Sequence, residues 1–194
     1  MREEALLRAF EETGALRRGH YELSSGLHSD VYFQAAILLQ HPDRAEVVGR
    51  ALARLLKPLE PEVVVGPALG GIIVGWEVAR ALGVRGLFTE RKDGQMMLRR
   101  SFEMKPGERA VVIEDVLTTG KSIRETSEAL RTAGAEVVGV GAIVDRSGGA
   151  IDFGIPLHVL LSLPVGSWEP SKCPECAQGT PVEKPGSRTQ AAVG

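Results

Sequence analysis

The most informative stretch of this sequence is Val111-Val112-Ile113-Glu114-Asp115-Val116-Leu117-Thr118-Thr119-Gly120-Lys121-Ser122. It begins as an apolar run of strand length, continues into two adjacent carboxylates, and ends in a turn rich in hydroxyl groups before a helical pattern. A buried strand that leads through a short turn into a helix is typical of a βαβ unit, whose strands are parallel. The stretch therefore predicts an α/β fold with polar residues at the carboxyl end of a strand.

The turn has the composition of a phosphate-binding loop. Free backbone N–H groups and the positive end of the helix dipole attract a phosphate, and the hydroxyls of Thr118, Thr119 and Ser122 add donors. Gly120 allows close approach of the backbone because it has no Cβ. The two carboxylates before the turn accept hydrogen bonds and suit a vicinal diol, such as the 2′ and 3′ hydroxyls of ribose. The stretch thus predicts a site for a ribose that carries a 5-phosphate.

Two other interpretations of this stretch compete with the phosphate site. Thr119-Gly120-Lys121-Ser122 resembles the end of a Walker A loop, but that motif requires glycine where Asp115 stands. Asp115 and Thr118 could also simply cap the following helix. The adjacent acidic pair and the preceding apolar strand favour the phosphate site, because several local choices agree.

The rest of the chain repeats the alternation of strand and helix. Helices are predicted over residues 3–12, from Pro42 onward, and over 70–82 and 122–133, with apolar strands at 63–65, 86–88, 111–113 and 137–144. This order predicts a mainly parallel sheet with helices on both faces, and ligands at the carboxyl ends of its strands.

The charge balance limits the classes of partner. The chain has 194 residues with 23 Lys+Arg against 25 Asp+Glu, a formal charge of −2. That balance argues against a protein that coats nucleic acid or an anionic membrane. The first residues, Met1-Arg2-Glu3-Glu4, are not followed by the apolar core of a signal peptide. We therefore expect a cytoplasmic protein with neither nucleic acid nor membrane as partner.

The composition changes near residue 163, because five of the 11 prolines lie beyond it. We expect one domain over 1–163 and a Pro/Gly-rich tail over 164–194 that wraps the surface or is partly disordered. Cys173 and Cys176 in the tail form half of a tetrahedral zinc site, but no second pair exists. His158 is the nearest histidine and lies in an apparent strand, and the other three, His20, His28 and His41, show no metal spacing among themselves. Incidental thiols are the preferred interpretation, a zinc shared between two subunits is the alternative, and no metal ligand is assigned.

Residues 111–123 resemble the phosphoribosyl pyrophosphate (PRPP) signature of the type I phosphoribosyltransferases, and the region from Gly14 to Arg146 resembles the members that use orotate. The resemblance implies a twisted, mainly parallel sheet flanked by helices, with a mobile hairpin loop and a small N-terminal hood over about 1–40. It also implies that PRPP is bound by every residue of the signature, namely Glu114, Asp115, Val116, Leu117, Thr118, Thr119, Gly120, Lys121 and Ser122. Thr118 would in addition contact orotate.

A second loop, Val65-Gly66-Pro67-Ala68-Leu69-Gly70-Gly71, follows the first predicted strand. The resemblance implies that Ala68, Leu69 and Gly70 hold the pyrophosphate of PRPP. Many relatives carry lysine where Gly70 stands, so binding here would depend on backbone N–H groups. The alternative is a glycine turn that packs a helix on a strand.

A third segment has a strong hairpin signal at Asp93-Gly94, with cations on both sides. In isolation such a charge run is usually a solvated face. The resemblance implies instead a mobile loop, residues 90–105, that closes over PRPP and is shared across the subunits of a homodimer. Arg91 and Lys92 match the basic pair at the start of that loop and are the candidate catalytic residues. A further lysine and histidine of the family have no clear match here.

Two more segments concern the base. Arg146 follows the predicted strand 137–144, and its planar guanidinium suits a base that bears oxygens and a carboxylate. It matches the arginine that contacts orotate in the family, although Asp145 and Arg146 could merely cap a turn. Tyr32 and Phe33 lie in a segment that resembles the N-terminal substrate loop, and either could be a core residue instead.

The resemblance implies a Mg²⁺-assisted transfer of ribose-5-phosphate from PRPP to orotate, in the biosynthesis of pyrimidine nucleotides. Mg²⁺ would be bound mainly through PRPP. A transferase for another base, such as a purine, is the next alternative, followed by a non-catalytic PRPP-binding regulator.

Overall fold

The computed structural model describes residues 3–23, 25–163 and 165–185. Its centre is a six-stranded sheet in the order β5-β4-β3-β6-β7-β8. The strands are β3 (Val63–Pro67), β4 (Arg85–Lys92), β5 (Gln95–Leu98), β6 (Arg109–Leu117), β7 (Glu136–Asp145) and β8 (Leu157–Ser162). All neighbours pair in parallel except β4 and β5, which form an antiparallel hairpin. The predicted mainly parallel sheet is confirmed.

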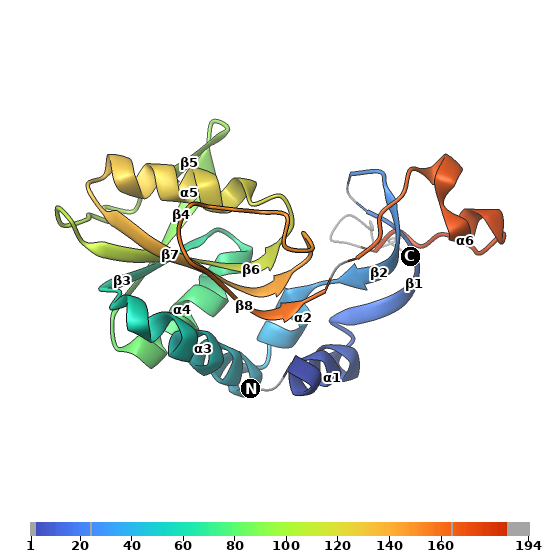
Figure 1. The fold of residues 1–194 in the computed structure, drawn as a ribbon, viewed down its shortest axis with the longest axis horizontal. Helices are drawn as coiled ribbons and strands as arrows, with labels where there is room; N and C mark the ends of the chain where they lie inside the picture. The colour runs from blue at the N-terminus through green and yellow to red at the C-terminus, as the bar shows by residue number, and fades with distance from the viewer. Residues whose placement is uncertain (1–2, 24, 164, 186–194) are drawn as a thin grey trace, which may run out of the picture.

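Helices cover both faces of the sheet, as Figure 1 shows. One face packs on α3 (Pro42–Leu56) and α4 (Gly70–Leu82), and the other on α5 (Lys121–Thr132). The buried side chains of β3 alternate accordingly, since Val64 belongs to the core beneath α3 and α4 whereas Val63 and Val65 belong to the core beneath α5. Covering both faces explains why these strands are apolar without interruption.

The described residues between 3 and 40 form a small lobe beside the strand carboxyl ends (Figure 1). It contains α1 (Glu3–Thr13), a two-stranded antiparallel sheet of β1 (Leu16–Glu22) and β2 (His28–Phe33), and α2 (Ala35–Leu39). Phe33 is buried and packs edge-to-face on Phe10 at 4.6 Å, so it is a core residue. Tyr32 lies on the opposite side of the strand against Tyr21. Of the two aromatics considered for the base, only Tyr32 is thus available.

The described part of the tail lies against this lobe. Trp168 exchanges two backbone hydrogen bonds with His28, and the Glu22 N–H donates to the carbonyl of Glu183 at 2.8 Å. The segment contains a 3-10 turn, Pro170–Lys172, and the one-turn helix α6 (Pro174–Ala177); a further 3-10 turn, Lys57–Leu59, follows α3. Residues 165–185 therefore wrap the lobe, whereas 164 and 186–194 lie outside the described residues. The domain boundary at 163 stays a prediction.

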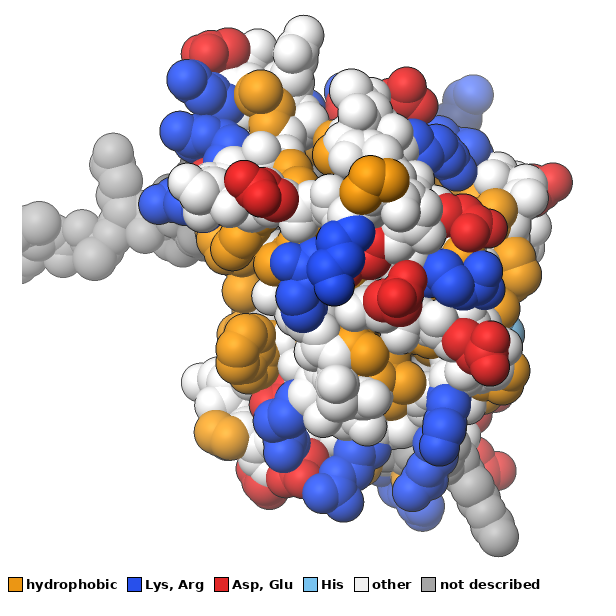
Figure 2. Space-filling view, turned by 90° about the vertical axis from the view of Figure 1, so that its left-hand side faces the viewer, with side chains coloured by type: hydrophobic (Ala, Val, Ile, Leu, Met, Phe, Trp, Pro, Cys, Tyr) orange, Lys and Arg blue, Asp and Glu red, His pale blue; other side chains and the backbone are white. Residues whose placement is uncertain are grey.

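Figure 2 shows the side of the molecule at which the parallel strands begin. Basic and acidic side chains are interspersed there, in keeping with the near-zero formal charge of −2. Among the described residues, none of the helices has the length and apolar character needed to cross a membrane.

Candidate active site

Two loops that the sequence analysis singled out lie side by side at the carboxyl ends of β3 and β6, which are neighbours in the sheet. A Cβ on Gly70 would stand 2.6 Å from both carboxylate oxygens of Asp115, so the loops approach as closely as glycine permits. Gly71 is equally restricted, because its Cβ would lie 2.6 Å from the carbonyl oxygen of Ile113. The glycines therefore join the two loops into one site.

The predicted phosphate loop has the expected form. β6 ends at Leu117, Thr118 and Thr119 are exposed, and Gly120, with φ +73°, is the N-cap residue that precedes α5. A hollow of about 40 Å³ lies over this turn, and its lining consists of Glu114 and residues 116–123. Because the first N–H groups of a helix have no intrahelical partner, they and the adjoining hydroxyls present donors to this hollow.

The two carboxylates of the site differ in their surroundings. Burial, and secondarily the charge of Asp115, raise the pKa of Glu114 from 4.5 to about 8. Asp115 accepts a hydrogen bond from the Val116 N–H at 2.7 Å. The raised pKa favours the protonated form of Glu114, which can donate as well as accept a hydrogen bond. A ribose diol, which both donates and accepts, matches that pair.

The second loop presents fewer donors than its sequence suggests. The Ala68 N–H donates to the carbonyl of Thr89 at 2.7 Å, which ties the loop to β4. Gly70 is the first residue of α4, so its N–H has no intrahelical acceptor. Leu69 is 84% exposed and its side chain extends into solvent. Of the three residues predicted to hold pyrophosphate, Leu69 and Gly70 are placed to do so through their backbone.

The cationic hairpin is folded back onto α5. Arg91 forms an ion pair with Glu125 and donates to the carbonyl of Gly94 at 2.6 Å. Hydrogen bonding to Glu125 raises the pKa of Arg91. Lys92 is exposed and forms no ion pair within residues 3–23, 25–163 and 165–185. Lys92 is therefore not held by a carboxylate of the described residues, whereas Arg91 is held by Glu125, a partner that the sequence does not indicate.

The other two arginines of the hairpin share one acceptor. Arg99 and Arg100 both contact the carboxylate of Glu90, at 3.2 and 2.9 Å. Arg100 and Ser101 have positive φ, +63° and +55°. The end of the hairpin is therefore a turn fixed by local ion pairs, in contrast to Lys92, which forms none among the described residues.

Arg146 lies at the end of β7 and its backbone N–H donates to the carbonyl of Leu117 at 2.8 Å. Its buried Nε has no hydrogen-bond partner in the described structure, and burial lowers the pKa of the guanidinium. Asp145 caps the following turn by accepting from the N–H groups of Ser147 and Gly149 at 2.7 and 3.3 Å. Asp145 thus performs the capping role, and the Nε of Arg146 remains without a partner among the described residues, which is unusual for a buried polar atom.

A segment that the sequence analysis did not assign covers the phosphate loop. A Cβ on Gly120 would lie 3.0 Å from Phe153 and 3.2 Å from Ile151. Arg124 of α5 stacks over the Phe153 ring at 4.9 Å. These apolar side chains follow no recognisable motif, so only the three-dimensional structure assigns them to the site.

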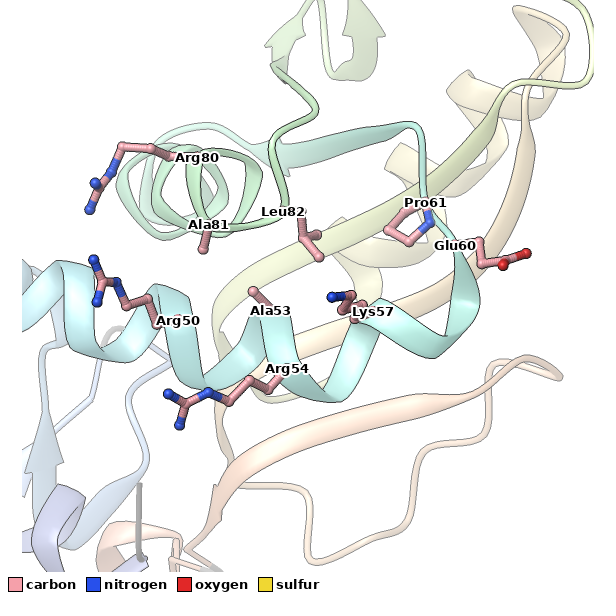
Figure 3. A pocket seen from close by; sticks show the side chains of 9 residues that line it. All are labelled: Arg50, Ala53, Arg54, Lys57, Glu60, Pro61, Arg80, Ala81 and Leu82. Carbon is pink, nitrogen blue, oxygen red and sulfur yellow. The ribbon is translucent and has the colours of Figure 1, made fainter.

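The basic pocket in Figure 3 is a separate feature. It has a volume of about 610 Å³ and lies between the carboxyl ends of α3 and α4, where β3 and β4 begin. Arg80 there is paired with Glu46 and Glu77, and Arg50 is paired with Glu46. Because ligands of open α/β sheets bind at the opposite, carboxyl ends of the strands, this pocket is not part of the active site.

The sheet order, the phosphate loop and the glycine loop beside it define the molecule as a phosphoribosyltransferase. The phosphoribosyl transferase domain family matches residues 34–153. Curated orotate phosphoribosyltransferases from Pelotomaculum thermopropionicum and Thermotoga maritima are 53% and 54% identical, covering 97% and 92% of this chain and 99% and 95% of theirs. The chain belongs to the orotate phosphoribosyltransferases.

Solved structures of orotate phosphoribosyltransferases have the same fold as this chain. The orotate phosphoribosyltransferase of Aeropyrum pernix superposes with a TM-score of 0.71 at 27% identity, covering 81% of this chain and 93% of that one. The Mycobacterium tuberculosis enzyme in complex with PRPP superposes with a TM-score of 0.63 at 26% identity, covering 81% of this chain and 96% of that one. The fold predicted from the sequence is confirmed.

Proposed function

We propose that this protein transfers ribose-5-phosphate from PRPP to N1 of orotate, giving orotidine 5′-monophosphate and pyrophosphate. The observation that carries the proposal is the contact between the glycine loop at Gly70 and the acidic pair at Asp115, beside an unpartnered Arg146. It brings potential phosphate, diol and carboxylate sites to the same edge of the sheet. The function of the relatives named above supports the same reaction.

Each part of the site has a distinct task in this reaction. The start of α5 binds the 5-phosphate through its N–H groups, and Glu114 with Asp115 holds the ribose hydroxyls. Departure of pyrophosphate builds negative charge, which Lys92 and a released Arg91 neutralise when the hairpin closes. Closure also excludes the water that would otherwise hydrolyse PRPP. Arg146 binds orotate as an anion, and the acidic ring nitrogen of orotate requires no strong protein base.

The proposal includes Mg²⁺, held mainly by the oxygens of PRPP. The oxygen ligands that Asp115 offers are of the kind this ion prefers, so the residues present fit it. When bound with PRPP, Mg²⁺ would supply charge neutralisation for the departing pyrophosphate. The protein's own residues orient the substrate and hold the hairpin over it.

We also propose a homodimer in which the hairpin 90–105 is shared between subunits. Trp76 is 62% exposed and Ile73 is 45% exposed, and together with Phe88 and Phe102 they line an apolar groove of about 390 Å³. Phe102 belongs to the hairpin segment, so the groove adjoins the loop to be shared. An apolar surface of this kind beside the active site fits a second copy of the chain.

The pathway and compartment follow from the substrates. The product would enter pyrimidine nucleotide synthesis, and the cytoplasm is proposed as the compartment because polyanions such as PRPP do not cross membranes unaided.

A steady-state assay tests the proposal directly. Purified protein receives PRPP and Mg²⁺, and the loss of orotate absorbance is followed, with uracil and purine bases run in parallel. We expect turnover of orotate alone. Turnover of another base would keep the PRPP site and reject the assignment of Arg146, and PRPP binding without turnover would favour a regulator.

A further inference from the structure

Four potential metal ligands from distant parts of the chain meet outside the active site. They are His20 on β1, His28 on β2, and Cys173 and Cys176 around the start of α6. Their ligand atoms all lie within 4.8 Å of one another. His20, His28 and Cys173 are buried, with exposed fractions of 3%, 7% and 3%. The fold thus supplies, within one chain, the two ligands that the Cys-x-x-Cys motif lacked in sequence.

The distances match the edges of a coordination tetrahedron. With Zn–N of about 2.0 Å and Zn–S of about 2.3 Å, ligand atoms of a tetrahedral site lie about 3.3 to 3.8 Å apart. His20 Nε2 is 3.4 Å from Cys173 Sγ and 3.6 Å from Cys176 Sγ, and His28 Nδ1 is 3.3 Å from Cys176 Sγ. The two histidine nitrogens are closer, 2.8 Å apart. Of the six edges of a tetrahedron, these three therefore have the expected length, the edge between the two histidine nitrogens is shorter, and the remaining two lie within 4.8 Å.

Hydrogen bonding alone does not account for the cluster. His20 Nδ1 lies 2.8 Å from the carbonyl oxygen of Thr180, so Nδ1 carries the proton and a neutral ring has a bare lone pair on Nε2. That single lone pair faces His28 and both thiols. If His28 Nδ1 carries a proton, it takes this lone pair and leaves both thiols facing it without an acceptor; if it does not, two lone pairs face each other at 2.8 Å, whereas one metal ion satisfies all four ligands. The bond to Thr180 also orients the ring, as is usual for a metal-bound histidine.

We propose that His20, His28, Cys173 and Cys176 bind a structural Zn²⁺ ion. Two thiolates and two imidazoles form a closed tetrahedral set that favours zinc over Mg²⁺ or Ca²⁺, and it leaves no position for a substrate. The metal ties residues that are 153 positions apart, and so fixes the tail on the N-terminal lobe. This inference does not depend on the transferase reaction.

The first test is the metal content of the full-length protein, purified under reducing conditions without chelator. We expect about one zinc per chain. Cys173→Ser and His28→Ala should each lose most of it, whereas His41→Ala, whose histidine precedes α3 and makes no side-chain cap there, should keep it. Zinc retained by both ligand variants, or no zinc in wild type even after dialysis against Zn²⁺, would overturn the proposal.

A second test uses wild-type protein only, so its outcome does not depend on whether a variant folds. Wild-type protein, stripped of metal and loaded with Co²⁺, should show the intense visible bands of a tetrahedral thiolate site; octahedral Co²⁺ bands alone would contradict it. Metal removal should lower the melting temperature by roughly 5 °C or more. It should also accelerate tryptic cleavage after Lys172, which directly precedes the Cys-x-x-Cys motif. A Cys173–Cys176 disulfide in the reduced preparation would equally refute a metal site.

Discussion

Gly70 and Asp115 are in contact across two neighbouring strands, with no room for a Cβ between the glycine and the carboxylate. A Cβ at position 70 would lie 2.6 Å from both Oδ1 and Oδ2. Oδ1 also accepts a hydrogen bond from the Val116 N–H at 2.7 Å, which holds the carboxylate in place. A side chain at position 70 therefore displaces one loop from the other, and the geometry of the PRPP site depends on this glycine.

Gly70→Ala should raise the KM for PRPP and lower kcat/KM by about tenfold or more, because an overpacked contact costs about 1–3 kcal/mol. The matched control is Gly75→Ala in the same helix, where a Cβ would have its nearest neighbour at 3.6 Å. Steady-state kinetics and thermal melting of both variants provide the comparison. Equal kinetics in the two variants would show that the contact is not needed for PRPP binding.

Arg146→Ala should weaken orotate binding far more than PRPP binding. Its buried Nε has no partner in the described structure, and a charge-assisted hydrogen bond to a carboxylate is worth about 1.5–3 kcal/mol, or roughly 10- to 100-fold in affinity. Arg54→Ala, in the pocket at the other end of the sheet, is the control. Isothermal titration with each substrate separates the effects, and an equal loss of both affinities would reject the assignment.

The elements that local pattern determines were predictable from the sequence. The buried strand at 111–113, its acidic end and the glycine turn are consecutive residues, so apolar periodicity and turn chemistry suffice. β1, in contrast, reads Leu-Arg-Arg-Gly-His-Tyr-Glu and has little apolar character. It becomes a strand by pairing with β2 and with Glu183 of the tail. Such pairing depends on residues far away in the chain.

Separation along the chain also explains which contacts of the site could not be predicted from the sequence. The partner of Arg91 is Glu125, which is 34 positions away on α5, and the histidines beside Cys173 are farther still. Phe153 covers the phosphate loop without any motif. Local chemistry thus predicts which residues bind PRPP, whereas the side chains that restrain or cover them required the tertiary structure.

Lys92→Ala should lower kcat while leaving the melting temperature unchanged, because the side chain is exposed and forms no ion pair within the described residues. Removing a cation that acts on a departing pyrophosphate typically lowers the rate by about 10- to 1,000-fold. Lys57→Ala, distant from the site, serves as the control. Unchanged kinetics in Lys92→Ala would transfer the role to Arg99 or Arg100.

Trp76→Glu should convert the proposed dimer into monomers, because it places a charge in an exposed apolar groove. Val47→Glu on α3, whose side chain is 51% exposed outside this groove, should leave the assembly unchanged. Sedimentation velocity of wild type and both variants measures the outcome. A wild-type protein that sediments as a monomer at micromolar concentration, or a dimer that survives Trp76→Glu, would refute the interface.

Glu114 makes stability depend on pH in a direction opposite to most carboxylates. Its pKa is raised from 4.5 to about 8, so between these values the folded state binds a proton that the unfolded state has released. The stabilisation that the protonated Glu114 carboxyl contributes is therefore fully present below pH about 4.5. It is lost progressively as the pH rises to about 8.

Glu114→Gln should remove this loss, because the amide stays neutral at every pH. We expect the variant to gain stability over wild type on going from pH 5 to pH 9, by an amount on the order of 1–4 kcal/mol. Urea unfolding at several pH values measures the difference, with Glu128→Gln on the exposed side of α5 as the control. If the difference between variant and wild type is the same at pH 5 and pH 9, Glu114 is not the group that titrates. The same variant should retain PRPP affinity better near pH 7 than Asp115→Asn, since Glu114 is already neutral there.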